Sequence, residues 1–123
     1  DDEFKERIMM AVTEVNGCRY CSYHHSKLAL EAGISKKELD LLLTGDFKNC
    51  PENEILALIY AQHWAEKQGQ PDQKLVLKVK NEYGEEKLAI INSAIRMINF
   101  GNLLGNSFDY FLYKISFGLL GQN

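Results

Sequence analysis

Proline, cysteine and long hydrophobic runs are scarce in this sequence, and basic residues are not in surplus. Only 2 of the 123 residues are proline, while 46% are hydrophobic and 25% are charged, which excludes disordered and collagen-like chains. A chain of this length buries about two thirds of its unfolded surface, enough for a hydrophobic core without a stabilising metal or disulfide. We therefore expect a single domain over residues 1–123.

The three cysteines argue against a secreted disulfide scaffold. They are too few for such a framework, and an odd number cannot all pair within one chain. No basic start followed by an apolar stretch resembles a signal peptide. We therefore expect a reducing compartment and a cytoplasmic location.

Charge and hydropathy exclude two classes of partner. The 17 acidic residues outnumber the 14 basic ones and give a formal net charge of -3, so no positive field is available for a nucleic-acid backbone. The longest apolar run covers residues 55–61, far short of the roughly 18 residues that a membrane-spanning helix needs. We expect neither a nucleic acid nor a membrane as a partner.

Glycine and proline divide the chain into segments whose apolar residues recur every three or four positions, as they do in helices. One segment precedes Gly17, one runs from Pro51 to about Gln68, and one covers residues 84–120. Because glycine is a poor helix former, Gly101 and Gly105 predict a bend or break in the last segment.

Capping residues mark two further helices. Ser35 can accept a hydrogen bond from the Glu38 N–H while the Glu38 carboxylate reaches back, which is the capping-box pattern. Asp72 is placed to cap another helix, and we interpret the ambiguous segment 75–79 as part of it. The sequence therefore predicts an all-α fold, a single-domain bundle of six or seven helices.

Residues 16–25, Asn-Gly-Cys-Arg-Tyr-Cys-Ser-Tyr-His-His, carry the chemistry of this sequence. Gly17 can end the first helix in the left-handed conformation, so Cys18 should lie at or just before the first turn of the next helix. At 100° per residue, Cys21 and His25 fall on the same face as Cys18, whereas His24 lies about 100° from His25.

Three features promote the reactive thiolate state here: a helix N-terminus, a neighbouring histidine and the C-x-x-C spacing. His25 lies beside Cys21 and can act as its base or pair with its thiolate. Cys18 is close enough to resolve an oxidised Cys21 as a disulfide. Glu6, set among apolar residues of the first helix, is the candidate carboxylate that orients the imidazole.

Other interpretations of these residues stay open. The two thiols and His25 could bind zinc, with His24, His63 or Cys50 as fourth ligand, in a non-catalytic metal-binding or redox-sensing module. We favour redox chemistry without a metal or cofactor, because no second ligand pair has zinc-finger spacing.

Three features outside the motif each allow two interpretations of their role. Cys50, beside Pro51, is either structural or reactive. The aromatic cluster between Phe108 and Phe117 belongs either to the core or to a subunit interface. A polar strip on the last helix either approaches the thiols or meets water; it consists of Asn99, Asn102, Asn106 and Asp109.

Glu6, eleven residues, C-x-x-C, three residues and His25 form a pattern that resembles the alkylhydroperoxidase D-like branch of the carboxymuconolactone decarboxylase family. The surrounding residues 7–35 look similar to that family too, and residues 98–102 echo the paired asparagines that relatives carry in a long helix. The resemblance implies an all-helical homo-oligomer, commonly a trimer or hexamer, with thiol-dependent peroxidase or disulfide reductase activity.

The resemblance also implies roles and partners. Cys21 matches the attacking thiol, Cys18 the thiol that completes the internal disulfide, and Glu6 with His25 the proton relay. The implied reductant is a dithiol, for some members a dihydrolipoyl protein, and the implied electron acceptor a peroxiredoxin. We do not expect decarboxylase activity, because the decarboxylase branch lacks the paired cysteines.

Overall fold

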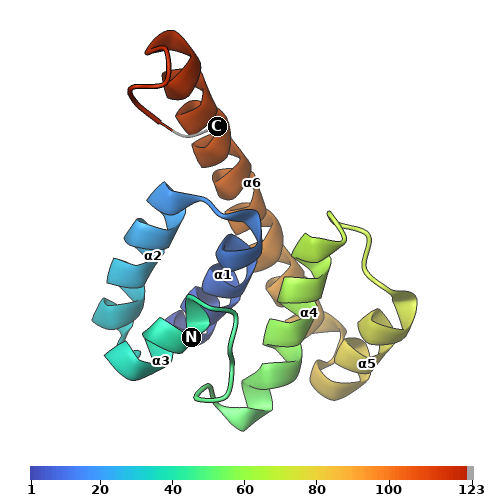
Figure 1. The fold of residues 1–123 in the computed structure, drawn as a ribbon. Helices are drawn as coiled ribbons and strands as arrows, with labels where there is room; N and C mark the ends of the chain where they lie inside the picture. Colours follow the sequence, from blue (N-terminus) through green and yellow to red (C-terminus); the bar gives the residue numbers. More distant parts are fainter. Residues whose placement is uncertain (122–123) are drawn as a thin grey trace.

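Six α-helices and one 3-10 turn make up the computed structural model, which describes residues 1–121 (Figure 1). In chain order they are α1 (Asp2–Asn16), α2 (Arg19–Ala32), α3 (Lys36–Leu42), the turn η1 (Glu52–Glu54), α4 (Ile55–Glu66), α5 (Gln73–Tyr83) and α6 (Glu85–Ile115). Residues 1–121 contain no strand. The predicted all-α bundle of six or seven helices is confirmed.

Helix α1 is the centre of the bundle and contacts α2, α3, α4 and α6. Every residue from Glu6 to Thr13 is buried, so more than two turns of this helix are enclosed on all sides. Met10, Ala11 and Val12 form its most buried part and pack with apolar side chains of α4 and α6. Polar groups on this part of α1 are consequently removed from water and need partners.

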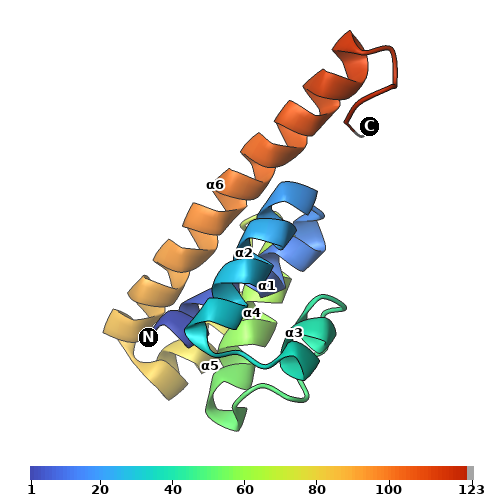
Figure 2. The same ribbon diagram turned by 90° about the vertical axis from the view of Figure 1, so that its left-hand side faces the viewer.

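Helix α6 is the longest element, and the predicted bend or break at Gly101 and Gly105 is wrong. The helix is continuous over 31 residues, about 46 Å at about 1.5 Å per residue. Contacts with α1 and α2 continue along this helix as far as Asp109, and only its C-terminal end extends beyond the other helices (Figure 2). The preference of glycine against helix, about 1 kcal/mol per residue, is too small to interrupt an element held by packing along its length.

The caps of α2 and α5 form at the residues that the sequence predicts. Gly17 ends α1 in the left-handed conformation with φ of 73°, and Cys18 is the N-cap of α2. The Asp72 side chain accepts a hydrogen bond from the Lys74 N–H at 2.9 Å, so the ambiguous segment 75–79 is helical, as predicted.

The cap of α3 follows the prediction only in part. Ser35 accepts the Glu38 N–H at 3.1 Å. The Glu38 carboxylate does not complete the capping box but accepts two hydrogen bonds from the buried Arg7 guanidinium, at 2.6 and 3.2 Å. A buried guanidinium needs a carboxylate more than an exposed helix end does. This ion pair ties α3 to α1.

The helix expected from Pro51 begins as the 3-10 turn η1 and continues as α4. Among residues 1–121, every helix is too short or too polar to cross a membrane.

Candidate active site

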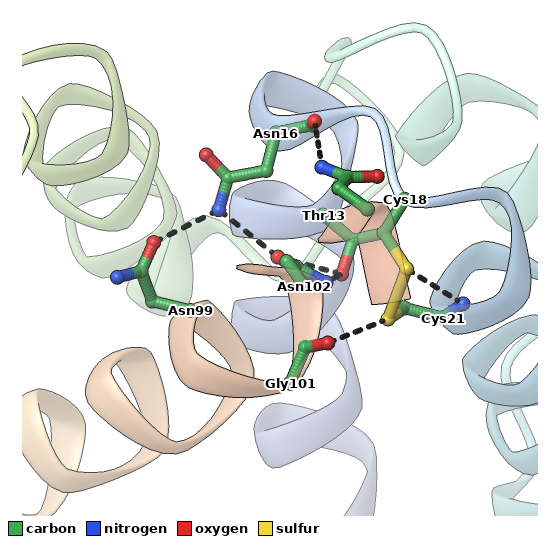
Figure 3. Close-up of a disulfide and its surroundings, with 8 residues drawn as sticks. Thr13, Asn16, Cys18, Cys21, Asn99, Gly101 and Asn102 are labelled. Atoms are coloured by element: carbon green, nitrogen blue, oxygen red, sulfur yellow. Dashed lines mark hydrogen bonds between the residues drawn. A yellow bond between two sulfur atoms is a disulfide. The ribbon is translucent and has the colours of Figure 1, made fainter. Parts of the chain in front are cut away.

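Cys18 and Cys21 form a disulfide at the start of α2, with their Cα atoms 5.3 Å apart (Figure 3). Cys18 is buried, with only 1% of its surface exposed, and Cys21 is partly buried. As N-cap, Cys18 also accepts a hydrogen bond at its sulfur from the Cys21 N–H at 3.2 Å. The two sulfurs therefore share one helix start but differ in their access to solvent.

Glu6 and His25 are in direct contact between α1 and α2. Oε2 of Glu6 lies 2.7 Å from Nδ1 of His25. The carboxylate is almost completely buried, with 3% of its surface exposed, and its second oxygen lies 3.9 Å from the Lys5 ammonium group. The structure therefore brings together the carboxylate and the imidazole that the sequence pattern pairs.

A cavity of about 360 Å³ opens beside Cys21 and His25. Apart from these two residues and His24, its walls are mainly apolar: they come from Met9, Tyr20, Met97, Ile98, Gly101 and Gly105. Cys21 and His25 thus line the same cavity. His24, whose ring lies 5.2 Å from that of His25, stands at the cavity wall.

A second cavity, of about 250 Å³, lies on the Cys18 side of the disulfide. Its walls include Glu14 of α1 and Arg19 of α2, so it carries both charge signs, unlike the larger cavity. Cys21 thus borders a mainly apolar cavity, whereas Cys18 borders a cavity that also contains charged side chains.

Gly105 of α6 allows this helix to lie directly against the disulfide. A Cβ atom at Gly105 would stand 2.5 Å from the Cys18 sulfur and 3.5 Å from the Cys21 sulfur. The carbonyl oxygen of Gly101 lies 3.5 Å from the Cys21 sulfur (Figure 3). The close approach of the α6 backbone to the Cys18 sulfur therefore requires a glycine at position 105, although glycine has a low helix propensity.

The polar strip of α6 approaches the thiol loop rather than water. Asn102 is completely buried and donates to the Thr13 hydroxyl at 3.1 Å, while the Asn16 amide donates to Asn99 at 2.9 Å and to Asn102 at 3.1 Å (Figure 3). Asn106 donates to the Asn16 backbone carbonyl at 2.9 Å. These bonds hold the end of α1, just before the cysteines, on α6.

Asp109 is the last member of the polar strip that the sequence indicates. Its buried carboxylate accepts hydrogen bonds from Arg19 at 2.7 Å and from the Tyr20 hydroxyl at 3.0 Å. Arg19 and Tyr20 are the two residues between the cysteines. Helical spacing placed Asp109 with Asn99, Asn102 and Asn106 on one helix face, but the sequence did not predict its contacts with Arg19 and Tyr20.

The other candidate ligands lie elsewhere. Cys50 is buried, its thiol lies 3.9 Å from the Glu38 carboxylate, and burial raises its pKa to about 12, which favours the structural interpretation. The Nε2 atom of His63 accepts a hydrogen bond from the Asp72 N–H at 3.0 Å. Within residues 1–121, no group of three His, Cys, Asp or Glu side chains has an arrangement that could hold a metal ion.

Comparison with known proteins supports the resemblance drawn from the motif. No curated protein shows significant similarity to the chain. Residues 1–47 match the model of the Carboxymuconolactone decarboxylase family, and this range contains Glu6, Cys18, Cys21 and His25. The predicted resemblance to the carboxymuconolactone decarboxylase family is thereby confirmed over residues 1–47.

Proposed function

We propose that this protein is a thiol-dependent oxidoreductase of the alkylhydroperoxidase D-like type, which reduces a peroxide or a disulfide with the Cys18 and Cys21 thiols. One observation carries the proposal: the cavity that Cys21 enters is also lined by His25, and the imidazole of His25 contacts a buried carboxylate. A nucleophile, its base and a group that orients the base are the parts that nucleophilic catalysis needs.

Cys21 is the attacking thiol, because it lines the larger of the two cavities and is partly exposed, whereas Cys18 is 1% exposed. With a peroxide, the Cys21 thiolate forms a bond to one oxygen, the O–O bond breaks, and the leaving oxygen takes a proton and departs as an alcohol or water. Cys21 is left as a sulfenic acid. The apolar cavity wall favours a peroxide with an apolar substituent.

His25 transfers the proton in this step, and Glu6 holds the imidazole ring in the orientation and tautomer that this transfer needs. With Nδ1–H donating to Glu6, the lone pair of the imidazole is on Nε2, which takes the Cys21 proton and returns it to the leaving oxygen. The buried Glu6 carboxylate stabilises the imidazolium formed between these two transfers.

Cys18 then resolves the oxidised Cys21. Its sulfur attacks the sulfenic sulfur, the S–S bond forms, and the hydroxyl leaves as water. The Cys18–Cys21 disulfide in the structure corresponds to the end of this half of the cycle. An external dithiol returns two electrons and two protons; following the family resemblance, we propose a dihydrolipoyl group as this reductant and a peroxiredoxin as a further electron acceptor.

Peroxide turnover with a dithiol reductant tests the assignment. Cys21→Ser and Cys18→Ser should each abolish turnover. His25→Gln and Glu6→Gln should each slow it by at least about tenfold, because the first removes the base and the second removes the carboxylate that orients the base. Cys50→Ser and Glu31→Gln, a buried thiol and an exposed α2 carboxylate outside the site, are the matched controls and should retain native rates.

Reduced protein treated with limiting peroxide should also gain a Cys18–Cys21 bond, detected by mass analysis. Peroxide turnover that survives in the Cys21→Ser variant would contradict the proposal.

We also propose that the chain forms a homo-oligomer, a trimer or hexamer in line with the resemblance, through α6. Seven apolar side chains spaced by three, four or seven residues are each more than half exposed on this helix: Ile90, Met97, Phe100, Leu104, Phe108, Phe111 and Ile115. We call them the α6 stripe. We propose that a second copy of the chain covers the α6 stripe, because the stripe contains no charge and no polar group that needs a specific partner.

A further inference from the structure

We propose that Asp109 is a positioning residue that sets the reduction potential of the Cys18–Cys21 pair by acting through Arg19 and Tyr20. The inference rests on the proposed function only in taking this pair as a reversible dithiol. It concerns a residue of α6 that lies far along the chain from the motif and outside the part that matches the family.

The contacts form a closed triangle. The Asp109 carboxylate, 7% exposed, accepts from Arg19 Nη2 at 2.7 Å and from the Tyr20 hydroxyl at 3.0 Å. Arg19 Nη2 also lies 3.2 Å from the Tyr20 hydroxyl, and its guanidinium carbon stands 5.0 Å from the centre of the Tyr20 ring. One carboxylate therefore fixes both residues between the cysteines, and both contacts cross from α6 to α2.

Through these two residues Asp109 reaches the surroundings of each sulfur. Arg19 shares the smaller cavity with Cys18, and Tyr20 shares the larger cavity with Cys21. Tyr20 is further held by Phe108 of α6, with ring centres 6.1 Å apart. A substitution of Asp109 should therefore alter the surroundings of both sulfur atoms.

The charges of Arg19 and Asp109 should shift the reduction potential of the cysteine pair in opposite directions. The disulfide is uncharged, whereas the reduced pair carries negative charge whenever a thiol ionises. A positive Arg19 stabilises the thiolate and with it the reduced form, which makes a dithiol a stronger oxidant. Asp109 opposes this effect and keeps the pair more reducing. The other charged or titratable groups of the two cavities are Glu14, His24 and His25, and none of them contacts Arg19 within hydrogen-bond distance.

Two variants with opposite expected shifts test the inference. Asp109→Asn should lower the thiol pKa and raise the equilibrium constant for reduction by three- to tenfold, a potential about 15 to 30 mV more positive. Arg19→Gln should shift both quantities in the opposite direction, and the double variant should return close to the native potential. The potential is measured by equilibration in a glutathione redox buffer at about pH 8.5, where an ordinary thiol is half ionised. The thiol pKa is followed by ultraviolet absorbance of the thiolate.

Glu86→Gln, an exposed carboxylate in the first turn of α6, is the control and should leave the potential unchanged. The inference is overturned if Asp109→Asn and Arg19→Gln shift the potential in the same direction, or if neither shifts it. Both variants would loosen the contact between α6 and α2, but only an electrostatic effect gives shifts of opposite sign. The Arg19 side chain is 46% exposed, so Arg19→Gln should fold even if Asp109→Asn does not. In that case the absence of a shift to a more negative potential in Arg19→Gln alone overturns the inference.

The outcome is separable from that of the proposed function. A pair that equilibrates with glutathione and shows the opposite shifts, but supports no peroxide or disulfide turnover, supports the inference and contradicts the proposed function. A pair that turns over substrate, but whose potential does not change in either variant, supports the proposed function and contradicts the inference.

Discussion

Cys50 shows at the scale of one residue how burial separates an inert thiol from a reactive one. Its side chain lies in the core beside the Glu38 carboxylate, and desolvation is the main reason that its pKa rises to about 12. The neighbouring negative charge raises the pKa further, and Arg7 only partly offsets it. Cys18 and Cys21, by contrast, stand at a helix start beside two cavities.

Alkylation of Cys50 should therefore be slow in the native protein. A pKa raised from 9.0 to about 12 lowers the thiolate fraction roughly a thousandfold near pH 8, and the thiolate is the reacting species. In a Cys18→Ser and Cys21→Ser double variant, iodoacetamide should modify Cys50 slowly, at a rate that rises about tenfold per pH unit, and quickly after unfolding. Rapid native labelling at pH 8, measured by mass spectrometry, would contradict the burial argument.

The same shift has a consequence for stability. Because the folded state raises the pKa of Cys50, its neutral form contributes stability that is fully present below pH 9, the ordinary value. That contribution is lost as the pH rises from about 9 toward 12.

At the scale of the element, α6 depends on two glycines with opposite surroundings. A Cβ atom at Gly105 would meet the Cys18 sulfur at 2.5 Å, and that sulfur is held in a disulfide and cannot rotate away. A Cβ atom at Gly101 would meet nothing within 4 Å. The two positions are one turn apart on the same helix, so each serves as the control for the other.

Substitution by alanine should therefore change stability with opposite signs. Gly101→Ala should stabilise the oxidised protein by about 1 kcal/mol through helix propensity. Gly105→Ala should gain the same propensity but lose about 1 to 3 kcal/mol through overpacking, a net loss of up to about 2 kcal/mol. Urea unfolding of the oxidised protein measures both. Equal changes at the two positions would show that the contact with the disulfide has no energetic weight.

At the scale of the whole molecule, α6 exposes the α6 stripe along most of its length, and the end of this helix extends past the body (Figure 2). Seven half-exposed side chains that each bury roughly 100 Å² amount to about 700 Å² per chain, close to the ~800 Å² per partner of a stable interface. Arg96, Asp109 and Lys114 are the charged residues between positions 90 and 115, and none is part of the stripe. A homo-oligomer would also cover Met97, which lines the cavity beside Cys21.

A charge placed in the stripe should disrupt this association. Leu104→Glu and Phe111→Glu should each convert the oligomer to monomers, because a carboxylate buried against apolar side chains lacks a partner. Gln73→Glu, which adds the same charge at an exposed position of α5, should leave the assembly intact. Sedimentation velocity distinguishes these states, and a native protein that sediments as a monomer at all concentrations would exclude the interface.

Local patterns in the sequence determined the all-α fold, the caps at Gly17 and Cys18, and the shared face of Cys21 and His25. These features depend on contacts between residues a few positions apart, which helix geometry fixes in advance. Glu6 was within reach of sequence reasoning because a carboxylate among apolar neighbours needs a partner, and the family pattern supplied one.

Only the tertiary structure decided the features that join distant segments. Glu38 pairs with Arg7 rather than with its own helix end, Asp109 holds the residues between the cysteines, and Gly105 supports a continuous helix instead of a break. The physical reason is common to all three. Local preferences amount to about 1 kcal/mol or less, whereas an unpaired buried charge or a clash with a buried sulfur costs more, so packing between elements determines the outcome.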